Sequence, residues 1–204
     1  MKTFMMLQGS EDWHRAKRGI PSASNFDRIL TNKTGKLSAQ ADDYIAELVS
    51  EMLSPFLPER AESYTSNAMR FGQENEAEAR RYYQMERDLD VQQIGGCMTD
   101  DGRLWCSPDG LVSDDGGLEL KAPLPKTHAK YLLKEGSLLD DYRQQVHGAL
   151  IVTGRAWWDL MSFSMGMPPV LIRVTPNGDT DALKVALDRF CDLYAAALAK
   201  VRAA

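Results

Sequence analysis

SPDGLVSDDGGLELKAP, at residues 107–123, predicts a β-hairpin with three charged side chains on one face. Glu119 and Lys121 are separated by one residue, so on a strand they point the same way, while the leucines beside Glu119 point the other way into a core. The DDGG segment is a good tight-turn sequence. A hairpin closed there brings Asp109 alongside Glu119, which places two carboxylates and an ammonium on one patch.

Such a patch has a direct use in phosphodiester hydrolysis. Oxygen ligands hold Mg²⁺, which polarises a phosphoryl oxygen and lowers the pKa of a bound water. Lys121 beside the metal would orient the nucleophilic water or stabilise developing negative charge. Alone, an Asp followed by Glu-x-Lys is a weak signal, and an exposed hairpin with an ordinary Glu/Lys pair remains an alternative. Pro108 and Pro123 bracket the apolar hairpin and favour the functional interpretation.

The rest of the chain has the pattern of one α/β unit with a mixed sheet. Apolar spacing predicts helices at 10–18, 22–31, 38–53, 68–88, 138–153 and 179–202. The helix at 22–31 is expected to be capped by Ser22 or Ser24. Short apolar or alternating stretches between turn signals predict strands at 91–97, 103–107, 109–113, 117–122, 156–163 and 170–175. A Pro-containing loop is expected at 54–60, and the last helix is expected to pack against the sheet.

Length and composition set broad limits on the protein. The 204 residues, 44% of them apolar, suffice for one core, so we expect a single domain over 1–204. Polar residues interrupt the apolar start before a signal peptide or membrane span is complete, which favours a soluble, cytoplasmic protein. The three cysteines lack CxxC spacing and indicate neither a disulfide framework nor a zinc ribbon. The formal charge of -5 argues mildly against DNA as a partner.

A local cluster of positive charge offsets that argument. His14, Arg15, Lys17 and Arg18 follow one another closely, and steering of an anion needs only a local field. Ser24, near a helix start, offers a hydroxyl and a backbone N–H to a phosphate. A solvated basic helix face is the alternative interpretation.

Several other residues have a functional and a structural interpretation. Glu76 would hold a second ion or its waters, or it is a solvated glutamate among others of its helix. Trp157 and Trp158 would stack on bases, although at least one of them is expected in the core. His128 and His147 have no second ligand at a metal-binding spacing, so we interpret them as surface or structural histidines.

Four blocks of sequence are more specific when taken together. In this order they resemble the phage lambda exonuclease and YqaJ-type recombinase family: WHRAKRGIPSAS (13–24), FGQENEAEARRYY (71–83), SPDGLVSDDGGLELKAP (107–123) and YRQQVHGALIVTGRAWWDL (142–160). The resemblance implies the PD-(D/E)XK class, with a restriction-endonuclease-like α/β core in which helices flank a central mixed sheet. It also implies Mg²⁺-dependent degradation of one strand of duplex DNA from its 5′ end to mononucleotides, which leaves 3′ single strands for recombination.

The same resemblance assigns roles to individual residues. It implies that Asp109, Glu119 and the Leu120 carbonyl bind metal, with two Mg²⁺ ions expected and Mn²⁺ as a substitute. Lys121 would assist the nucleophile.

Two further site residues follow from the family pattern. Glu76 joins from the long helix, and Gln145 is selected over its neighbour Gln144 by the YxxQ spacing from Tyr142. The Gln145 amide has no metal preference and is expected to hold a water or the scissile phosphate by hydrogen bonds. Gln144 should point elsewhere on the helix.

The family also holds the terminal 5′ phosphate through a basic residue and a serine, which correspond to Lys17 and Ser24. The family's arginine is replaced here by Lys17, while Arg15 and Arg18 flank it. Lysine binds phosphate as a point charge and not through a bidentate fork, so the identity of the contacting basic residue is left open. The resemblance further implies a toroidal homotrimer and a single-strand-annealing partner protein.

Two other functions use the same residues. A restriction-like or junction-resolving endonuclease would share the metal patch, but it has no need of a 5′-phosphate pocket. A non-catalytic DNA-end-binding scaffold would be indicated by loss of Asp109, Glu119 or Lys121, and all three are present.

Overall fold

A five-stranded mixed sheet forms the centre of the computed structural model, which describes residues 1–31, 37–54 and 67–204. Its strands are β2 (Val91–Gln92), β5 (Gly110–Val112), β6 (Gly116–Lys121), β7 (Trp157–Ser162) and β8 (Val170–Val174), in the order β2-β5-β6-β7-β8. β5 and β6 form the predicted antiparallel hairpin, and β6 and β7 are parallel. The predicted mixed sheet is confirmed.

A second sheet contains three short strands. These are β1 (Lys2–Phe4), β3 (Gly96–Met98) and β4 (Trp105–Cys106), in the order β1-β3-β4. The single strand predicted at 91–97 is wrong, because β2 and β3 belong to different sheets, and β1 was not predicted. The chain changes sheets at Gly95 and Gly96, where an added Cβ would lie 2.4 Å from Met6 Cγ and 2.1 Å from the Trp105 ring. Only glycine permits such close approach.

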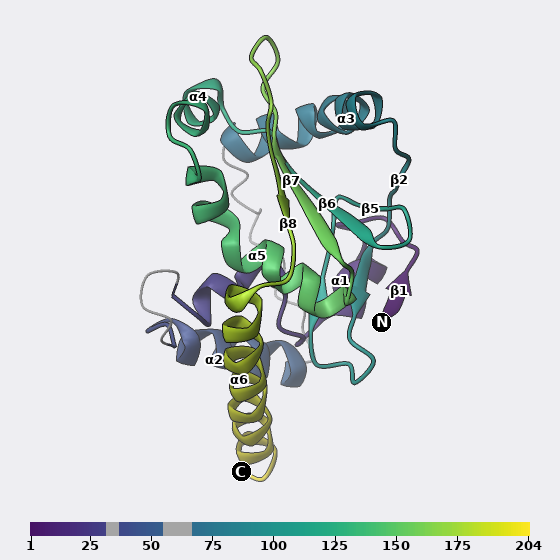
Figure 1. Cartoon of the computed structure of the whole chain (residues 1–204). Helices are drawn as coiled ribbons and strands as arrows, with labels where there is room; N and C mark the ends of the chain where they lie inside the picture. Colours follow the sequence, from purple (N-terminus) through teal and green to yellow (C-terminus); the bar gives the residue numbers. More distant parts are fainter. Residues whose placement is uncertain (32–36, 55–66) are drawn as a thin grey trace.

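Different helices lie on the two sides of the larger sheet (Figure 1), and each side buries its own cluster of side chains. α3 (Asn67–Arg87) covers one face, where Ala79 and Tyr83 pack with Leu118 and Leu120 of β6. α5 (Ser137–Thr153) packs on the other face, against Trp158 of β7. The leucines of β6 therefore point into a core, away from its two charged residues, as the alternation predicts.

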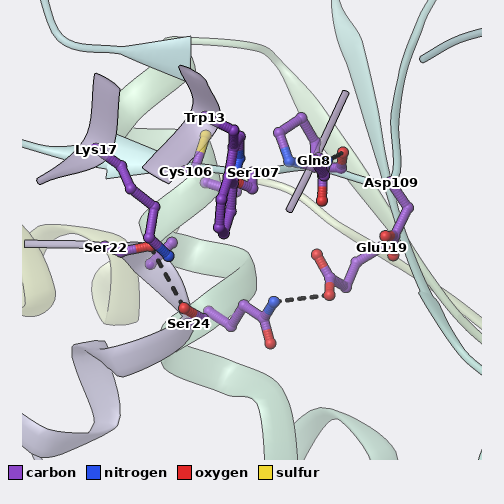
Figure 2. A pocket seen from close by; sticks show the side chains of 13 residues that line it. Gln8, Trp13, Lys17, Ser22, Ser24, Cys106, Ser107, Asp109 and Glu119 are labelled. Carbon is purple, nitrogen blue, oxygen red and sulfur yellow. Dashed lines mark hydrogen bonds between the residues drawn. The ribbon is translucent and has the colours of Figure 1, made fainter. Parts of the chain in front are cut away.

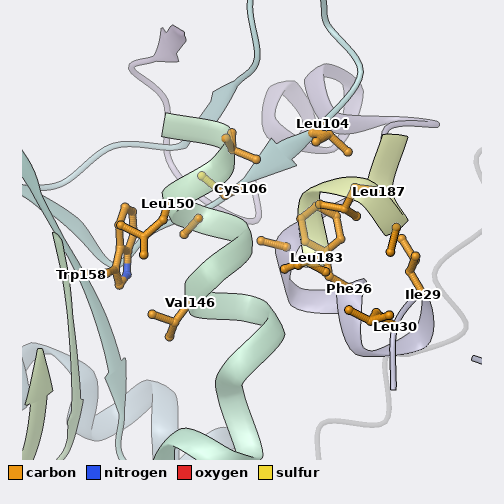
Figure 3. Close-up of a cluster of buried hydrophobic side chains, with 14 of the residues drawn as sticks. Phe26, Ile29, Leu30, Leu104, Cys106, Val146, Leu150, Trp158, Leu183 and Leu187 are labelled. Carbon is orange, nitrogen blue, oxygen red and sulfur yellow. The ribbon is translucent and has the colours of Figure 1, made fainter. Parts of the chain in front are cut away.

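Further helices pack beyond α5. α2 (Ala41–Leu53), α6 (Gly178–Arg202) and the 3-10 helix η1 (Ala23–Arg28) form this layer, and Figure 3 shows Phe26, Leu183 and Leu187 gathered beside α5. α6 packs mainly on α5 and α2, so the expectation that it packs directly on the sheet is wrong. Within the described ranges, no helix is both long and apolar enough to span a membrane.

The predictions for individual helices and loops were partly confirmed and partly wrong. α1 (Glu11–Lys17) is confirmed, whereas the helix predicted at 22–31 is the shorter η1. Ser22 occupies its N-cap position without a side-chain capping bond, and the Ser22 N–H donates instead to Tyr44 Oη at 3.0 Å. α4 (Pro125–Leu133) was missed, although a proline at its first position was an available signal. Of the loop expected at 54–60, residues 55–60 lie outside the described residues.

The singled-out histidines are structural and not surface residues. His128 is buried, with Nδ1 2.7 Å from Ser162 Oγ and Nε2 2.9 Å from the Pro168 carbonyl. His147 is also buried, with Nδ1 2.8 Å from Thr180 Oγ1. Both rings are fixed by hydrogen bonds, as buried polar groups generally are.

One of the two adjacent tryptophans lies in the core, as expected. Trp158 is fully buried in the core, while the partly buried Trp157 has the Arg173 guanidinium 3.7 Å from its ring centroid. This cation occupies one of the two ring faces on which a nucleobase could stack.

η1 approaches α5 closely at Gly148, where an added Cβ would lie 2.3 Å from Phe26 Cδ2 and 3.3 Å from Ala23 Cβ. Gly148→Ala is expected to lower the free energy of unfolding by about 1–3 kcal/mol, as overpacking does. Urea unfolding measures this change. Gly178→Ala, whose Cβ meets nothing within 4 Å, is the matched control, and equal losses in both variants would contradict the prediction.

Candidate active site

Asp109 is held against β6 at the position just before β5 begins. β5 begins at Gly110, opposite Leu118, whereas β6 continues to Lys121. The Asp109 N–H donates to the Leu118 carbonyl at 3.1 Å, and Asp109 Oδ2 accepts from the Leu120 N–H at 2.6 Å. The carboxylate thus takes the place of a strand along this part of β6.

Glu119, Lys121 and Gln145 form a hydrogen-bonded cluster on the face that α5 covers. Glu119 Oε1 accepts from Lys121 Nζ at 2.6 Å and from Gln145 Nε2 at 2.7 Å, and Lys121 Nζ also donates to Gln145 Oε1 at 3.1 Å. The exposed fractions of the Glu119 and Lys121 side chains are 7% and 19%. This ion pair is therefore largely removed from water, and the pair that an exposed hairpin would present is excluded.

The two adjacent glutamines of α5 point in different directions, as predicted. Gln144 is buried and donates to the Leu30 carbonyl at 3.2 Å, away from the cluster. Within α5, Tyr142 has a non-helical conformation (φ -123°, ψ 15°), and its ring centroid lies 4.3 Å from Lys121 Nζ. The start of the YxxQ segment therefore also contacts the cluster.

Neighbouring charges shift the titration of this site. Burial raises the pKa of Asp109 well above its ordinary value; Glu119 raises it further, Lys121 opposes the change, and Glu76 adds to it. Burial opposes the charge on Lys121, but Glu119 and Asp109 outweigh it and raise the Lys121 pKa. Carboxylates placed so close together favour a bound cation or a proton.

The oxygen donors at this site suit a hard divalent cation. Asp109 and Glu119 supply carboxylates, and the Leu120 carbonyl faces the same strand edge as the Leu120 N–H bound by Asp109. Across the described ranges, no group of three or more His, Cys, Asp or Glu side chains has a metal-binding arrangement. A cation here would therefore be held by two carboxylates, a backbone carbonyl and water, a ligand set that Mg²⁺ accepts.

Two cavities adjoin the carboxylates. The first, of about 240 Å³, has Lys17 and Ser24 at one end and Asp109 and Glu119 at the other (Figure 2). The second, of about 480 Å³, extends from Asp109 toward α3. Three residues line both cavities: Gln8, Trp13 and Asp109.

Glu76 lines the second cavity and is not part of the hydrogen-bonded cluster. Its Oε1 accepts from Arg80 Nη2, one helical turn further along α3. Glu76 acts on Asp109 through its charge, which helps to raise the Asp109 pKa.

Lys17 and Ser24 both reach the first cavity, as the resemblance implies. Lys17 Nζ lies 3.9 Å from the centroid of the Trp13 ring, within the range of a cation–π interaction. The hydroxyl of Ser24 lies 3.4 Å from that of Ser22, which also lines the cavity. A cation and two hydroxyl groups therefore stand together at this end.

The two arginines of the same segment point elsewhere. Arg15 has 73% of its side chain exposed and pairs with Asp12 at 3.3 Å. Arg18 donates to the backbone carbonyls of Glu51 and Ser54 at the end of α2. Neither arginine is among the described residues that line the first cavity.

The sequence did not single out two residues whose side chains bond the segment just before Asp109. Trp13 Nε1 donates to Ser107 Oγ at 3.1 Å, and Gln8 Nε2 donates to the Pro108 carbonyl at 2.8 Å. The only sequence signal for Trp13 was its place at the start of WHRAKRGIPSAS, the first of the four blocks that resemble the family. Gln8 had no sequence signal, because its hydrogen-bond partner lies 100 positions away in the chain.

Comparison with solved structures places this geometry among known folds. The chain is similar to an alkaline exonuclease from Laribacter hongkongensis, with a TM-score of 0.79 and 26% identity over 95% of this chain and 96% of that chain. The same enzyme in complex with dAMP gives a TM-score of 0.80. A phage-related exonuclease from Haemophilus somnus shares the fold at a TM-score of 0.67 and 12% identity, over 89% and 96% of the two chains. No curated protein matches the sequence significantly.

The model of the YqaJ-like viral recombinase domain matches residues 12–156. The chain belongs to this family. The matched range of the YqaJ-like domain runs from α1 to the end of the segment before β7, so it contains every predicted site residue, whereas β8 and α6 lie beyond it. The resemblance seen in the sequence is confirmed.

Asp109→Asn would remove one carboxylate of this YqaJ-like site and keep an oxygen for the Leu120 N–H. Because the Asp109 pKa is raised in the folded protein, wild-type stability falls as the pH rises from the ordinary carboxyl value toward the raised value. With a chelator present, the variant is expected to be more stable than wild type at neutral pH, with no difference below about pH 4. Denaturant unfolding at both pH values measures this, and a variant that is less stable at neutral pH would contradict it.

Proposed function

We propose that this protein is a metal-dependent exonuclease that degrades one strand of duplex DNA from its 5′ end to mononucleotides. The observation that carries the proposal is the desolvated pair of Glu119 and Lys121 beside Asp109. Glu119 and Asp109 line one end of a cavity whose other end is lined by Lys17. Membership of the YqaJ-like family and similarity to a structure described as an alkaline exonuclease support nuclease activity.

Asp109, Glu119 and the Leu120 carbonyl would hold Mg²⁺, and Glu76 would bind a second ion or its waters. When bound, such ions polarise the scissile phosphate, lower the pKa of a water and stabilise the leaving oxygen. Mn²⁺ is expected to substitute for Mg²⁺. The cation would also relieve the repulsion that raises the Asp109 pKa.

Lys121 is expected to act as a fixed cation and not as a proton acceptor. Its pKa is raised, so it stays protonated at neutral pH and adds positive charge where the phosphate becomes more negative. Gln145 binds both Lys121 and Glu119, so its amide is held in place to hydrogen-bond a water or a phosphate oxygen.

The first cavity suits a terminal 5′ phosphate. Lys17 is the one basic residue among the described residues that line it, and the Ser22 and Ser24 hydroxyls lie nearby. The Trp13 ring restrains the Lys17 ammonium, which compensates in part for the missing arginine fork. The alkaline exonuclease to which the chain is similar binds dAMP, a mononucleotide of the kind that such cleavage would release.

Digestion of a linear duplex that carries a 5′ phosphate on one strand only, beside a closed circle, tests the proposal. Wild type is expected to consume the phosphorylated strand with Mg²⁺ and not with EDTA, and Lys121→Ala to lose activity by about a hundredfold or more. Cutting of the circle would indicate the endonuclease, and no metal-dependent cutting would indicate the DNA-end-binding scaffold.

Lys17→Ala is expected to lose most of the preference for 5′-phosphorylated over 5′-hydroxyl ends, by about tenfold to a hundredfold, because a charged hydrogen bond is removed. Rates on the two kinds of end measure the preference. Arg15→Ala removes an exposed cation from the same helix and is expected to keep it. If Arg15→Ala lost the preference and Lys17→Ala kept it, the assignment of Lys17 would be wrong.

The remaining family properties stay predictions. They are a homotrimeric ring around DNA, a single-strand-annealing partner protein, a role in recombination and a cytoplasmic location.

A further inference from the structure

We propose that the second cavity binds the phosphate on the 3′ side of the scissile bond, and that Arg80 is the residue that holds it. The proposal rests on the exonuclease function and extends it to the next nucleotide of the strand. Its basis is a nearly buried guanidinium in a cavity of about 480 Å³ that opens onto Asp109.

The position of the second cavity suits the continuing strand. The first cavity lies on the α5 side of Asp109, where Glu119 and Gln145 line it, and the second lies on the α3 side, where Glu76 and Arg80 line it. Asp109 belongs to both. A strand with its 5′ phosphate in the first cavity and its scissile phosphate at Asp109 therefore has the second cavity directly ahead of it.

Charge singles out Arg80 in this cavity. It is the one basic residue among the described residues that line the second cavity, as Lys17 is in the first. Glu76 and Asp109 would otherwise repel a phosphate there. The two cations stand on either side of the carboxylates, which matches a strand with a phosphate on each side of the scissile one. A guanidinium also suits phosphate because it stays charged and donates hydrogen bonds to anionic oxygens.

The contacts of Arg80 orient its guanidinium and leave a donor for a ligand. Only 12% of the side chain is exposed. Nη2 donates to Glu76 Oε1, and the Gln93 amide oxygen, in the orientation that satisfies its hydrogen bonds, accepts from Nη1 at 2.9 Å and from Nη2 at 3.2 Å. Nε is buried and has no partner among the described residues, so the second N–H of Nη1 is the donor left for a ligand. Since a guanidinium has five N–H donors, these contacts do not exhaust it.

The cavity also offers an apolar wall for the sugar or base of that nucleotide. Met6 and Leu7 line it beside Arg80, and Leu7 is 79% exposed. A nucleotide bound here would place its phosphate on the guanidinium and its less polar parts against these two side chains. Because a nucleotide has both a charged phosphate and less polar parts, an apolar wall next to a cation suits it.

The test measures release of the first nucleotide in single turnover with Mg²⁺, from a duplex end whose second internucleotide phosphate is replaced by an uncharged methylphosphonate. In wild type, the replacement is expected to slow release by about tenfold to a hundredfold, because a charged hydrogen bond is lost. Arg80→Gln is expected to be slowed by a similar factor on the natural strand and to be insensitive to the replacement, which shows that residue and phosphate act together.

Matched controls come from the same helix and the same strand of DNA. Arg81, with 77% of its side chain exposed, contacts Glu78 at 3.9 Å, so Arg81→Gln is expected to keep the wild-type sensitivity. Arg80→Lys keeps the charge and is expected to keep part of the sensitivity, which provides a second variant if Arg80→Gln folds poorly. A methylphosphonate placed far inside the duplex should leave all rates unchanged.

Two outcomes would overturn the proposed phosphate subsite and leave the proposed exonuclease function standing. In one, wild type is insensitive to the methylphosphonate. In the other, Arg80→Gln is slower than wild type on both strands but equally sensitive, as expected if Arg80 only positions Glu76. A wild-type protein that releases no nucleotide from the natural strand would instead overturn the exonuclease function, and the subsite with it.

Discussion

The hydrogen bond from the Leu120 N–H to the Asp109 carboxylate exists because β6 is longer than its neighbour. The pairing of β5 with β6 reaches only as far as Gly110 opposite Leu118. Beyond Leu118, the β5 side of β6 has backbone groups without a strand partner. Asp109 accepts a hydrogen bond from the Leu120 N–H, and the Leu120 carbonyl faces the same edge of the strand. An open sheet edge is usually a liability, but here it supplies both the support and the ligands of the proposed cation site.

The parallel pairing of β6 and β7 explains which side chains complete the site. Parallel neighbours need a long crossover, and α5 lies within it, across the face that carries Glu119 and Lys121. Gln145 is thereby held over the strand. The opposite face is covered by α3, which contributes Glu76 and Arg80. Asp109, at the end of the hairpin, is reached from both sides, and this is why two cavities meet there.

The net charge of -5 is a poor guide to this molecule, because the field that a substrate meets is local. Lys17 and Arg80 each stand as the one basic residue on the described wall of a cavity. Both are restrained, Lys17 by the Trp13 ring and Arg80 by Glu76. Two oriented cations on either side of a carboxylate pair match a polyanionic strand better than the composition suggests.

The sequence by itself determined the hairpin and the common face of Glu119 and Lys121, because strand alternation is a local property. The choice of Gln145 over Gln144 came from the resemblance to the family's YxxQ pattern. Only the tertiary structure decided the split into two sheets at Gly95 and Gly96. It also decided that Arg15 and Arg18 point away from the first cavity while Lys17 lines it. It also decided the places of Gln8 and Arg80. These features depend on close approach between distant segments, as in the Gln8 contact across 100 positions, and a local pattern carries no record of such contacts.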